Sequence, residues 1–157
     1  MNIFAALDQS SSLQIPAPKS VLDITSPSRR SLLFIDSSVA DAQTLVNGAS
    51  SGTEVHLLRS GQDAVAQITQ TLLGRSGIES LQIVSHARSG ALQLGETWLD
   101  GQSLPGYVGQ LKSWGAALGV DADILLYGCN LAQDAAGQAF VNLLAEATGR
   151  MWRLPMI

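Results

Sequence analysis

The sequence predicts an α/β fold in which a mainly parallel central sheet lies between two layers of helices, a three-layer sandwich. Short apolar runs alternate repeatedly with segments of helical spacing, which is typical of parallel sheets with helices on both faces. Of the 157 residues, 46% are hydrophobic, enough to fill the core of one domain. No internal sequence repeat points to another architecture.

Four strands are expected at short apolar runs that end in polar residues, a pattern typical of strands buried on both faces. They cover residues 32–36, 54–59, 80–86 and 122–129. Because crossovers between parallel strands are right-handed, the third and fourth strands are expected to be neighbours.

Helices are expected between the strands, with a small hairpin after the third strand. Ser38 is expected to cap the first helix, and the last helix should end at Gly149. Residues 91–100 alternate around Gly95 and Glu96, which indicates the hairpin. The apolar residues expected to face the core are Val39, Ala42, Leu45 and Val46 in the first helix, Val65, Ile68 and Leu72 in the second, Leu104, Val108, Leu111 and Leu118 in the third, and Ala136, Phe140 and Leu144 in the fourth.

Three segments are expected along the chain. Residues 1–30 are rich in Ser, Pro and Gln and have no sustained period, which is typical of an irregular, disordered tail. Residues 31–149 carry the α/β pattern, and residues 150–157 form a carboxyl-terminal tail. Tyr127 and Trp152, like the other aromatic residues, are expected to be packing residues.

Composition excludes several classes of partner. Nine Lys and Arg against thirteen Asp and Glu give a net charge of −4, and the basic residues form no run, so no nucleic acid is expected. No apolar run reaches the roughly 18 residues of a membrane span. The first residues do not resemble a secretory signal peptide, which leaves a cytoplasmic location open. One Cys and two separated His are too few for a zinc site, so no metal or cofactor is expected.

Two reactive side chains follow the carboxyl ends of strands, where ligands collect in parallel sheets. His86 ends the third predicted strand and Cys129 the fourth, and neighbouring strands lie about 4.8 Å apart. The imidazole and the thiol are therefore expected at one rim, close enough to share a substrate. A cysteine peptidase needs this pair, a thiolate nucleophile and a histidine that transfers protons.

Structural interpretations of these residues stay open. A lone cysteine after an apolar strand is commonly an inert buried thiol, and a lone histidine such as His86 is equally ambiguous. His56 lies within the second predicted strand and is expected to be a sheet or surface histidine.

Three stretches of the sequence resemble a bacterial domain family of unknown function, DUF4347. They are FIDSSVADAQTLV at 34–46, QIVSHARSGALQLGETWLD at 82–100 and ILLYGCNLAQDAAGQAFVNLLAEATG at 124–149. The resemblance covers residues 31–149. It implies a module near the amino end of large exported adhesins, and hence a secreted or cell-surface location.

The order of histidine-bearing strand, hairpin, helix and cysteine-bearing strand also resembles, more loosely, the caspase and gingipain superfamily of cysteine endopeptidases. The resemblance implies a caspase-like sandwich with His86 and Cys129 as catalytic residues and the backbone N–H groups of Ala87 and Cys129 as the oxyanion hole. It also implies that Asp36 helps to bind substrate, where its charge would favour Arg or Lys. From the residues alone, the alternative is favoured that Asp36 is a cap or turn residue beside Ser37 and Ser38.

Two features differ from these relatives. The superfamily has glycine directly after the histidine, whereas this chain has Ala87, whose Cβ disfavours a positive φ. The family continues past Gly149 with a strand beside the fourth one, so we expect a truncated carboxyl end and an unpaired ILLY edge.

Three functions follow as hypotheses: a caspase-like cysteine endopeptidase acting on a peptide or on its own polypeptide, a non-catalytic docking or assembly module of a surface or secreted protein, or an inactive truncated fragment. The substrate and the oligomeric state are left open.

Overall fold

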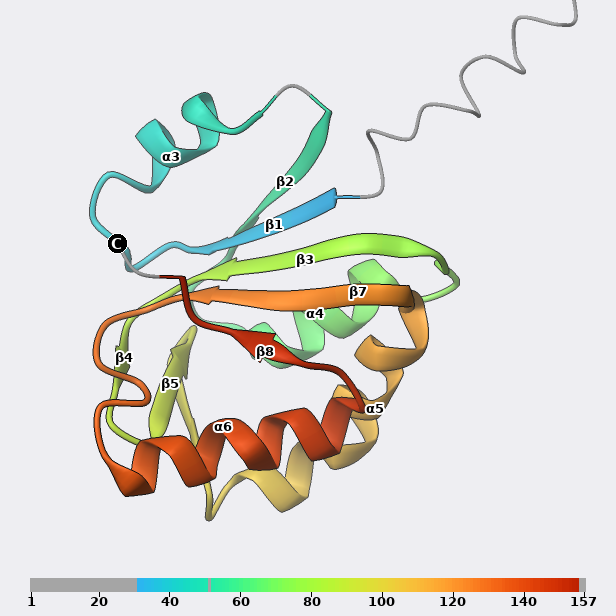
Figure 1. The fold of residues 1–157 in the computed structure, drawn as a ribbon. Coiled ribbons are helices and arrows are strands. Elements are labelled where there is room, and N and C mark those ends of the chain that lie inside the picture. The colour runs from blue at the N-terminus through green and yellow to red at the C-terminus, as the bar shows by residue number, and fades with distance from the viewer. Residues whose placement is uncertain (1–30, 51, 156–157) are drawn as a thin grey trace, which may run out of the picture.

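The computed structural model describes residues 31–50 and 52–155, and a five-stranded parallel sheet lies at its centre (Figure 1). The strand order is β2-β1-β3-β7-β8, and a small antiparallel sheet has the order β4-β5-β6. The strands are β1 (Ser31–Asp36), β2 (Thr53–Leu58), β3 (Ile78–Val84), β4 (Ala87–Arg88), β5 (Ala91–Leu94), β6 (Thr97–Asp100), β7 (Leu118–Tyr127) and β8 (Trp152–Arg153). The helices are α3 (Ala42–Gly48), α4 (Ala64–Leu72), the 3₁₀ turn η3 (Leu104–Tyr107), α5 (Val108–Ala117) and α6 (Ala135–Thr148).

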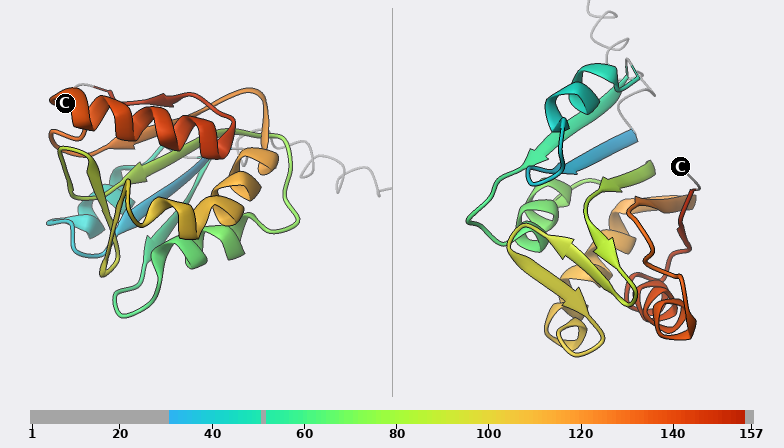
Figure 2. Two further views of the ribbon diagram at one scale, coloured as in Figure 1. Left: turned by 90° about the horizontal axis from the view of Figure 1, so that it is seen from below. Right: turned by 90° about the vertical axis from the view of Figure 1, so that its left-hand side faces the viewer.

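The direction of each crossover decides which face of the sheet its helix covers. The connection from β1 to β2 runs one way along the sheet, whereas those to β3, β7 and β8 run the other way. Because parallel crossovers are right-handed, α3 must lie on one face and α4, α5 and α6 on the opposite face. Figure 1 shows this division, and the left view of Figure 2, from below, shows the three helices side by side in front of the sheet. The predicted α/β sandwich with a mainly parallel sheet is confirmed.

The core lies between the sheet and the three helices on its lower face. Side chains alternate along each strand, so every second residue points to this side. Burying each large apolar side chain there contributes roughly 1.5–3 kcal/mol. On this side, the fully buried residues of the three central strands are Leu32 and Phe34 on β1, Leu81 and Ile83 on β3, and Ile124 and Leu126 on β7.

The opposite face is covered only in part, because α3 is its only helix in the described part of the chain. No residue of α3 is buried. Leu33, Val84 and Tyr127, which alternate with the core residues, are therefore only half-buried. This difference between the two faces shapes the candidate site.

Several local predictions need correction at helix ends. α3 begins at Ala42 after Asp41, and Ser38 does not cap it. Its predicted inward stripe fails too, since Leu45 is 40% exposed. Apolar spacing predicts burial only where a second layer exists to bury against, and α3 packs on the open face.

The third and fourth helices also differ from their predicted stripes. Val108, the first residue of α5, is 43% exposed, and Leu118 belongs to β7. On α6, Ala136 was expected to be buried but is exposed, and Gly137 is buried instead. The remaining predicted inward residues of α4, α5 and α6 are buried, and the hairpin of β5 and β6 turns at Gly95 and Glu96 as predicted.

The stretch after Gly149 is built into the domain. Trp152 and Arg153 form β8, which pairs in parallel with Ile124 and Leu125 of β7. The expectation of an unpaired edge at ILLY is therefore wrong at these positions. Trp152 is only 6% exposed, and its indole N–H donates to Thr148 Oγ1 at 3.0 Å.

Arg150 fastens the same stretch to the end of α5. Its guanidinium donates to the carbonyls of Gly115 at 3.2 Å and Leu118 at 2.9 Å, and also to Gly119. The last carbonyls of a helix have no partner within the helix, so a cation there satisfies both their hydrogen bonds and the helix dipole.

Two expectations concern the ends of the chain and its relation to membranes. The tail expected at residues 1–30 and the last two residues, 156–157, lie outside the described residues. Within residues 31–50 and 52–155, no helix is long and apolar enough to cross a membrane.

Candidate functional site

The candidate site lies at the carboxyl end of the sheet where the chain changes its direction of winding. From β1 the chain crosses to β2 on one side, and β3 follows on the other side of β1. In open α/β sheets the crevice at such a switch point is where ligands bind. The segments that leave β1 and β3 at this point carry Ser38 and His86.

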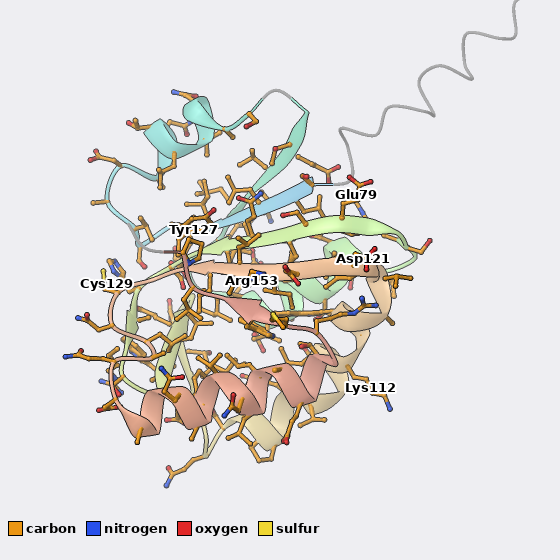
Figure 3. The ribbon with its side chains drawn as sticks, in the orientation of Figure 1. Glu79, Lys112, Asp121, Tyr127, Cys129 and Arg153 are labelled. Carbon is orange, nitrogen blue, oxygen red and sulfur yellow. The ribbon has the colours of Figure 1, made fainter. Side chains whose placement is uncertain are left out.

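His86 and Cys129 come together at this edge because of the register of two strands. β3 and β7 are paired with Val84 opposite Tyr127, and the Ser85 N–H extends the pairing by donating to the Tyr127 carbonyl at 3.2 Å. Two residues further on, His86 stands level with Cys129. Both side chains are exposed, and both line one cavity of about 610 Å³ between α3 and the sheet. Figure 3 shows Cys129 just beyond the end of β7, beside Tyr127.

The imidazole of His86 is fixed by the loop that follows β1. Its Nε2 lies 3.2 Å from the backbone carbonyl of Ser38. A carbonyl only accepts, so this hydrogen bond requires a proton on Nε2 and leaves Nδ1 available for a second partner.

Asp36 precedes this loop and accepts hydrogen bonds from it. The carboxylate is 1% exposed. Its Oδ1 accepts from the N–H of Ser38 at 2.9 Å and from the Ser38 hydroxyl at 2.7 Å, and its Oδ2 accepts from the Gly95 N–H at 2.5 Å. This is the turn role that its place beside Ser37 and Ser38 suggested, and Asp36 does not line the cavity of His86 and Cys129.

The two backbone N–H groups expected to form an oxyanion hole, those of Ala87 and Cys129, are not engaged in the hydrogen bonds of the sheets. Gln93 N–H donates to the His86 carbonyl at 2.9 Å, which makes the pair of Ala87 and Leu92 a non-hydrogen-bonded one, so the Ala87 N–H points away from β5. The backbone N–H of Cys129 makes no hydrogen bond to another described residue. Both groups are therefore available as donors.

Ala87 adopts an ordinary backbone conformation. Asp41 and Asn130 are the non-glycine residues of the described chain with positive φ, so Ala87 has no need of a glycine's freedom. Its methyl group lies against Gly128, where an added Cβ would come within 2.9 Å of it. The alanine thus packs on the residue that precedes Cys129.

Two hydrogen bonds join the loop after His86 to the loop after Cys129. Gly90 N–H donates to the Leu131 carbonyl at 3.1 Å. The Ser89 hydroxyl donates to Asp134, which also caps α6 by accepting from the Gly137 N–H at 2.9 Å. The Ser89 hydroxyl, followed by the Gly137 N–H, holds the pKa of Asp134 below its ordinary value.

Sequence patterns did not indicate the walls of the cavity. Val39 and Leu45 line it from the α3 side, and Tyr127, expected to be a packing residue, lines it from the sheet. Their apolar spacing predicts a core, because apolar residues at regular spacing look the same in the sequence whether they face a core or a groove.

Asn130 and a second cavity complete the surroundings of Cys129. Asn130 has φ 58°, a left-handed conformation that asparagine tolerates better than most residues, and it turns the chain directly after the thiol. Beyond this turn lies a second cavity of about 570 Å³, which Gly128 and Cys129 also line and Leu154 helps to close. The thiol therefore stands between two hollows.

In the described part of the chain, the remaining histidine and the other possible metal ligands form no second site. His56 lies in β2, stacks on Phe34 with 5.2 Å between ring centroids, and bonds to Glu54 at 2.7 Å. The prediction of a sheet histidine is confirmed. Within residues 31–50 and 52–155, no three His, Cys, Asp or Glu side chains gather as a metal site would require.

Comparison with known proteins identifies the family. No curated protein and no solved structure matches the chain. Residues 32–152 match the family described as Domain of unknown function (DUF4347), a match that covers well over half of the chain and reaches Trp152 in β8. The resemblance seen in the three sequence stretches is confirmed, and the chain belongs to the DUF4347 family.

Proposed function

We propose that the domain is a caspase-like cysteine endopeptidase, with Cys129 as nucleophile and His86 as general acid and base. The observation that carries this proposal is the shared cavity: both exposed side chains line it, at the switch point of the sheet. The substrate is a peptide segment, either of another protein or of the polypeptide to which the domain belongs.

The proposed reaction splits one peptide bond in two steps. The Cys129 thiolate attacks the carbonyl carbon, and the C–S bond forms as the C–N bond breaks. The leaving amine takes a proton from the His86 imidazolium. Water then attacks the thioester and gives one proton to His86, and the C–S bond breaks, which releases the carboxylic acid and restores the Cys129 thiolate and the His86 imidazolium. The N–H groups of Ala87 and Cys129 are the proposed donors to the negatively charged oxygen formed in each step.

The contact with Ser38 supports the role of His86. A histidine that transfers protons must keep one ring position and orientation, and the Ser38 carbonyl provides a fixed acceptor at 3.2 Å for Nε2. Nδ1 is then the atom that exchanges a proton with the thiol and the leaving amine. Asp36 acts one step further away in this proposal, since it holds the Ser38 loop in place.

We place this activity in an exported parent protein, at the cell surface or secreted. The support is the resemblance to modules of large adhesins, where a self-processing activity would release or mature the polypeptide after export.

The reaction rate of the thiol tests the proposal. Iodoacetamide should alkylate Cys129 at least about tenfold faster than it alkylates a free cysteine peptide at pH 7, because a histidine that shares the cavity can take the thiol proton as the new C–S bond forms. His86→Ala should remove this excess. The measurement is the rate of mass increase of the intact 157-residue chain.

His56→Gln is the matched control, since it removes the other histidine and leaves the cavity of Cys129 unchanged. It should alkylate at the rate of the parent protein. Equal and ordinary rates in all three proteins would rule out a His86–Cys129 dyad.

A second candidate function, a non-catalytic docking or assembly module, is favoured by the partly covered sheet face. Half-buried Leu33, Val84 and Tyr127 offer a surface on which another segment could pack. If docking is the function, replacing the cysteine that corresponds to Cys129 with alanine in a full-length exported relative leaves processing and surface display unchanged. Loss of processing in that variant would favour the peptidase.

A further inference from the structure

We infer that the cavity beside His86 and Cys129 binds an uncharged, apolar side chain of the peptide, adjacent to the bond that Cys129 attacks. The binding part of this inference stands on the cavity alone, and the position of the bond rests on the proposed function. The expected substrate side chain is therefore apolar, and not the Arg or Lys that a substrate-binding Asp36 would favour.

Apolar groups and a few neutral polar side chains, among them Gln82 and Ser85, line the cavity, and apart from His86 and Cys129 it has no residue that could carry a charge near neutral pH. Leu33 and Val84 form its floor on the sheet, and Val39 and Leu45 face them from the α3 side. No Asp, Glu, Lys or Arg lines it. Its volume of about 610 Å³ leaves room for a large side chain such as leucine, methionine or phenylalanine.

A charged side chain would lose hydration in this cavity without meeting a carboxylate, an ammonium or a guanidinium group of opposite charge. Asp36 ends β1, but it is 1% exposed and already engaged, since Oδ1 accepts from Ser38 and Oδ2 from Gly95. Burial of an unpaired charge is far more costly than burial of an apolar group. The cavity therefore selects against Arg, Lys, Asp and Glu.

The second cavity gives the rest of the peptide a place to continue. Gly128 and Cys129 line both hollows, so a chain seated in the first passes the thiol and enters the second. There the backbone turn at Asn130 and the side chain of Leu154 form the walls. An extended peptide across this edge would bring one peptide bond next to sulfur.

Binding of short peptides to Cys129→Ala tests the inference without any chemistry. Three fluorescently labelled, capped pentapeptides differ only in a central Leu, Arg or Asp, and fluorescence anisotropy measures their dissociation constants. The leucine peptide should bind at least about tenfold more tightly than either charged peptide, the discrimination expected of an apolar pocket that must exclude a charge.

Two further variants locate the binding. Leu45→Asp, made in Cys129→Ala, places a carboxylate in the cavity wall and should reduce the preference for leucine at least about tenfold, and it should improve binding of the arginine peptide. Leu143→Asp is the matched control: Leu143 on α6 has the same 40% exposure as Leu45 but does not line the cavity. It should bind like Cys129→Ala itself.

The outcomes separate this inference from the proposed function. A leucine preference that Leu45→Asp removes supports the inference even if alkylation of Cys129 proves ordinary, in which case only the peptidase proposal fails. Tighter binding of the arginine or aspartate peptide, or equal binding of all three, overturns the inference. If the alkylation rate of Cys129 still depends on His86 in that case, the peptidase proposal is unaffected. Self-association that Leu45→Asp abolishes, with no peptide bound, would make the cavity an interface between copies and would also overturn it.

Discussion

Two buried hydroxyls, of Ser85 and Thr148, should respond in opposite ways to removal. Each residue is 5% exposed. The Ser85 hydroxyl has no hydrogen-bond partner among the described residues, whereas Thr148 Oγ1 donates to the Leu144 carbonyl at 2.9 Å and accepts from Trp152. An unsatisfied buried hydroxyl costs about 1–3 kcal/mol, and a satisfied one stabilises.

We therefore expect Ser85→Ala to raise the free energy of unfolding by about 1 kcal/mol and Thr148→Val to lower it by about 1–3 kcal/mol. Urea denaturation of both variants measures the two changes. A loss of stability in Ser85→Ala would mean that its hydroxyl has a partner in solution.

Glu54 gives the domain a pH-dependent contribution to stability. Arg75 binds both carboxylate oxygens, at 2.8 and 3.1 Å. This ion pair, with a smaller contribution from His56, holds the pKa of Glu54 below its ordinary value of 4.5. Because the folded pKa is depressed, the stabilisation is complete above pH 4.5 and is lost as the pH falls through the folded value.

Glu54→Gln should accordingly lower the free energy of unfolding at pH 7 by up to about 1 kcal/mol, since the pair is partly exposed and screened by solvent. The difference from the parent protein should shrink below pH 4.5. Urea denaturation between pH 3 and 7 checks this, with Glu146→Gln on the exposed side of α6 as the control for loss of one negative charge. A difference that stays constant with pH would show that the ion pair is not its source.

At this scale, sequence reasoning placed His86 and Cys129 at one edge of the sheet but left two roles open for Asp36. The positions of His86 and Cys129 were predictable because strand ends and parallel register determine them. The environment of Asp36 depends on Gly95, a residue 59 positions away in the hairpin. Contacts between distant loops leave no periodic trace in the sequence.

Among the elements, the crossing of α5 and α6 depends on one glycine. A Cβ on Gly115 of α5 would meet the Thr148 carbonyl of α6 at 1.7 Å, so the backbones lie too close for any side chain. Gly109, in the first turn of the same helix, would place its Cβ in open space.

Gly115→Ala should therefore lower the free energy of unfolding by about 3 kcal/mol, the upper part of the usual cost of overpacking. Gly109→Ala should raise it by up to about 1 kcal/mol, because alanine is the better helix former. Thermal unfolding by circular dichroism measures both. Equal effects would show that helix propensity, rather than the close crossing, governs both sites.

The same contrast explains which elements could be predicted. α4 was predicted from Val65, Ile68 and Leu72 because its stripe meets the core, and all three residues are buried. α3 carries a comparable stripe with no full layer opposite it, so its inward residues line a groove instead. Periodicity predicts a helix and its apolar side, but it does not say what that side faces.

For the whole molecule, alternation of strands and helices together with the handedness of crossovers was sufficient to predict the architecture. The closing strand was not predictable, because β8 has only two residues and shows no pattern of its own. Its meaning comes from partners elsewhere: Arg150 reaches the end of α5, and Trp152 reaches both β7 and Thr148. The residues after Gly149, which composition alone would assign to a tail, should therefore contribute to the free energy of unfolding of the domain.

Substitution of Trp152 tests that conclusion. Trp152→Ala should lower the free energy of unfolding by about 3 kcal/mol or more, since it removes a large buried side chain and the hydrogen bond to Thr148. Met151→Ala, at a neighbouring residue that is 58% exposed, should change it by less than about 0.5 kcal/mol. Urea denaturation followed by far-UV circular dichroism is the measurement, since it does not depend on tryptophan emission. If both variants unfold like the parent protein, β8 does not close the sheet in solution, and the edge of β7 is free for another strand.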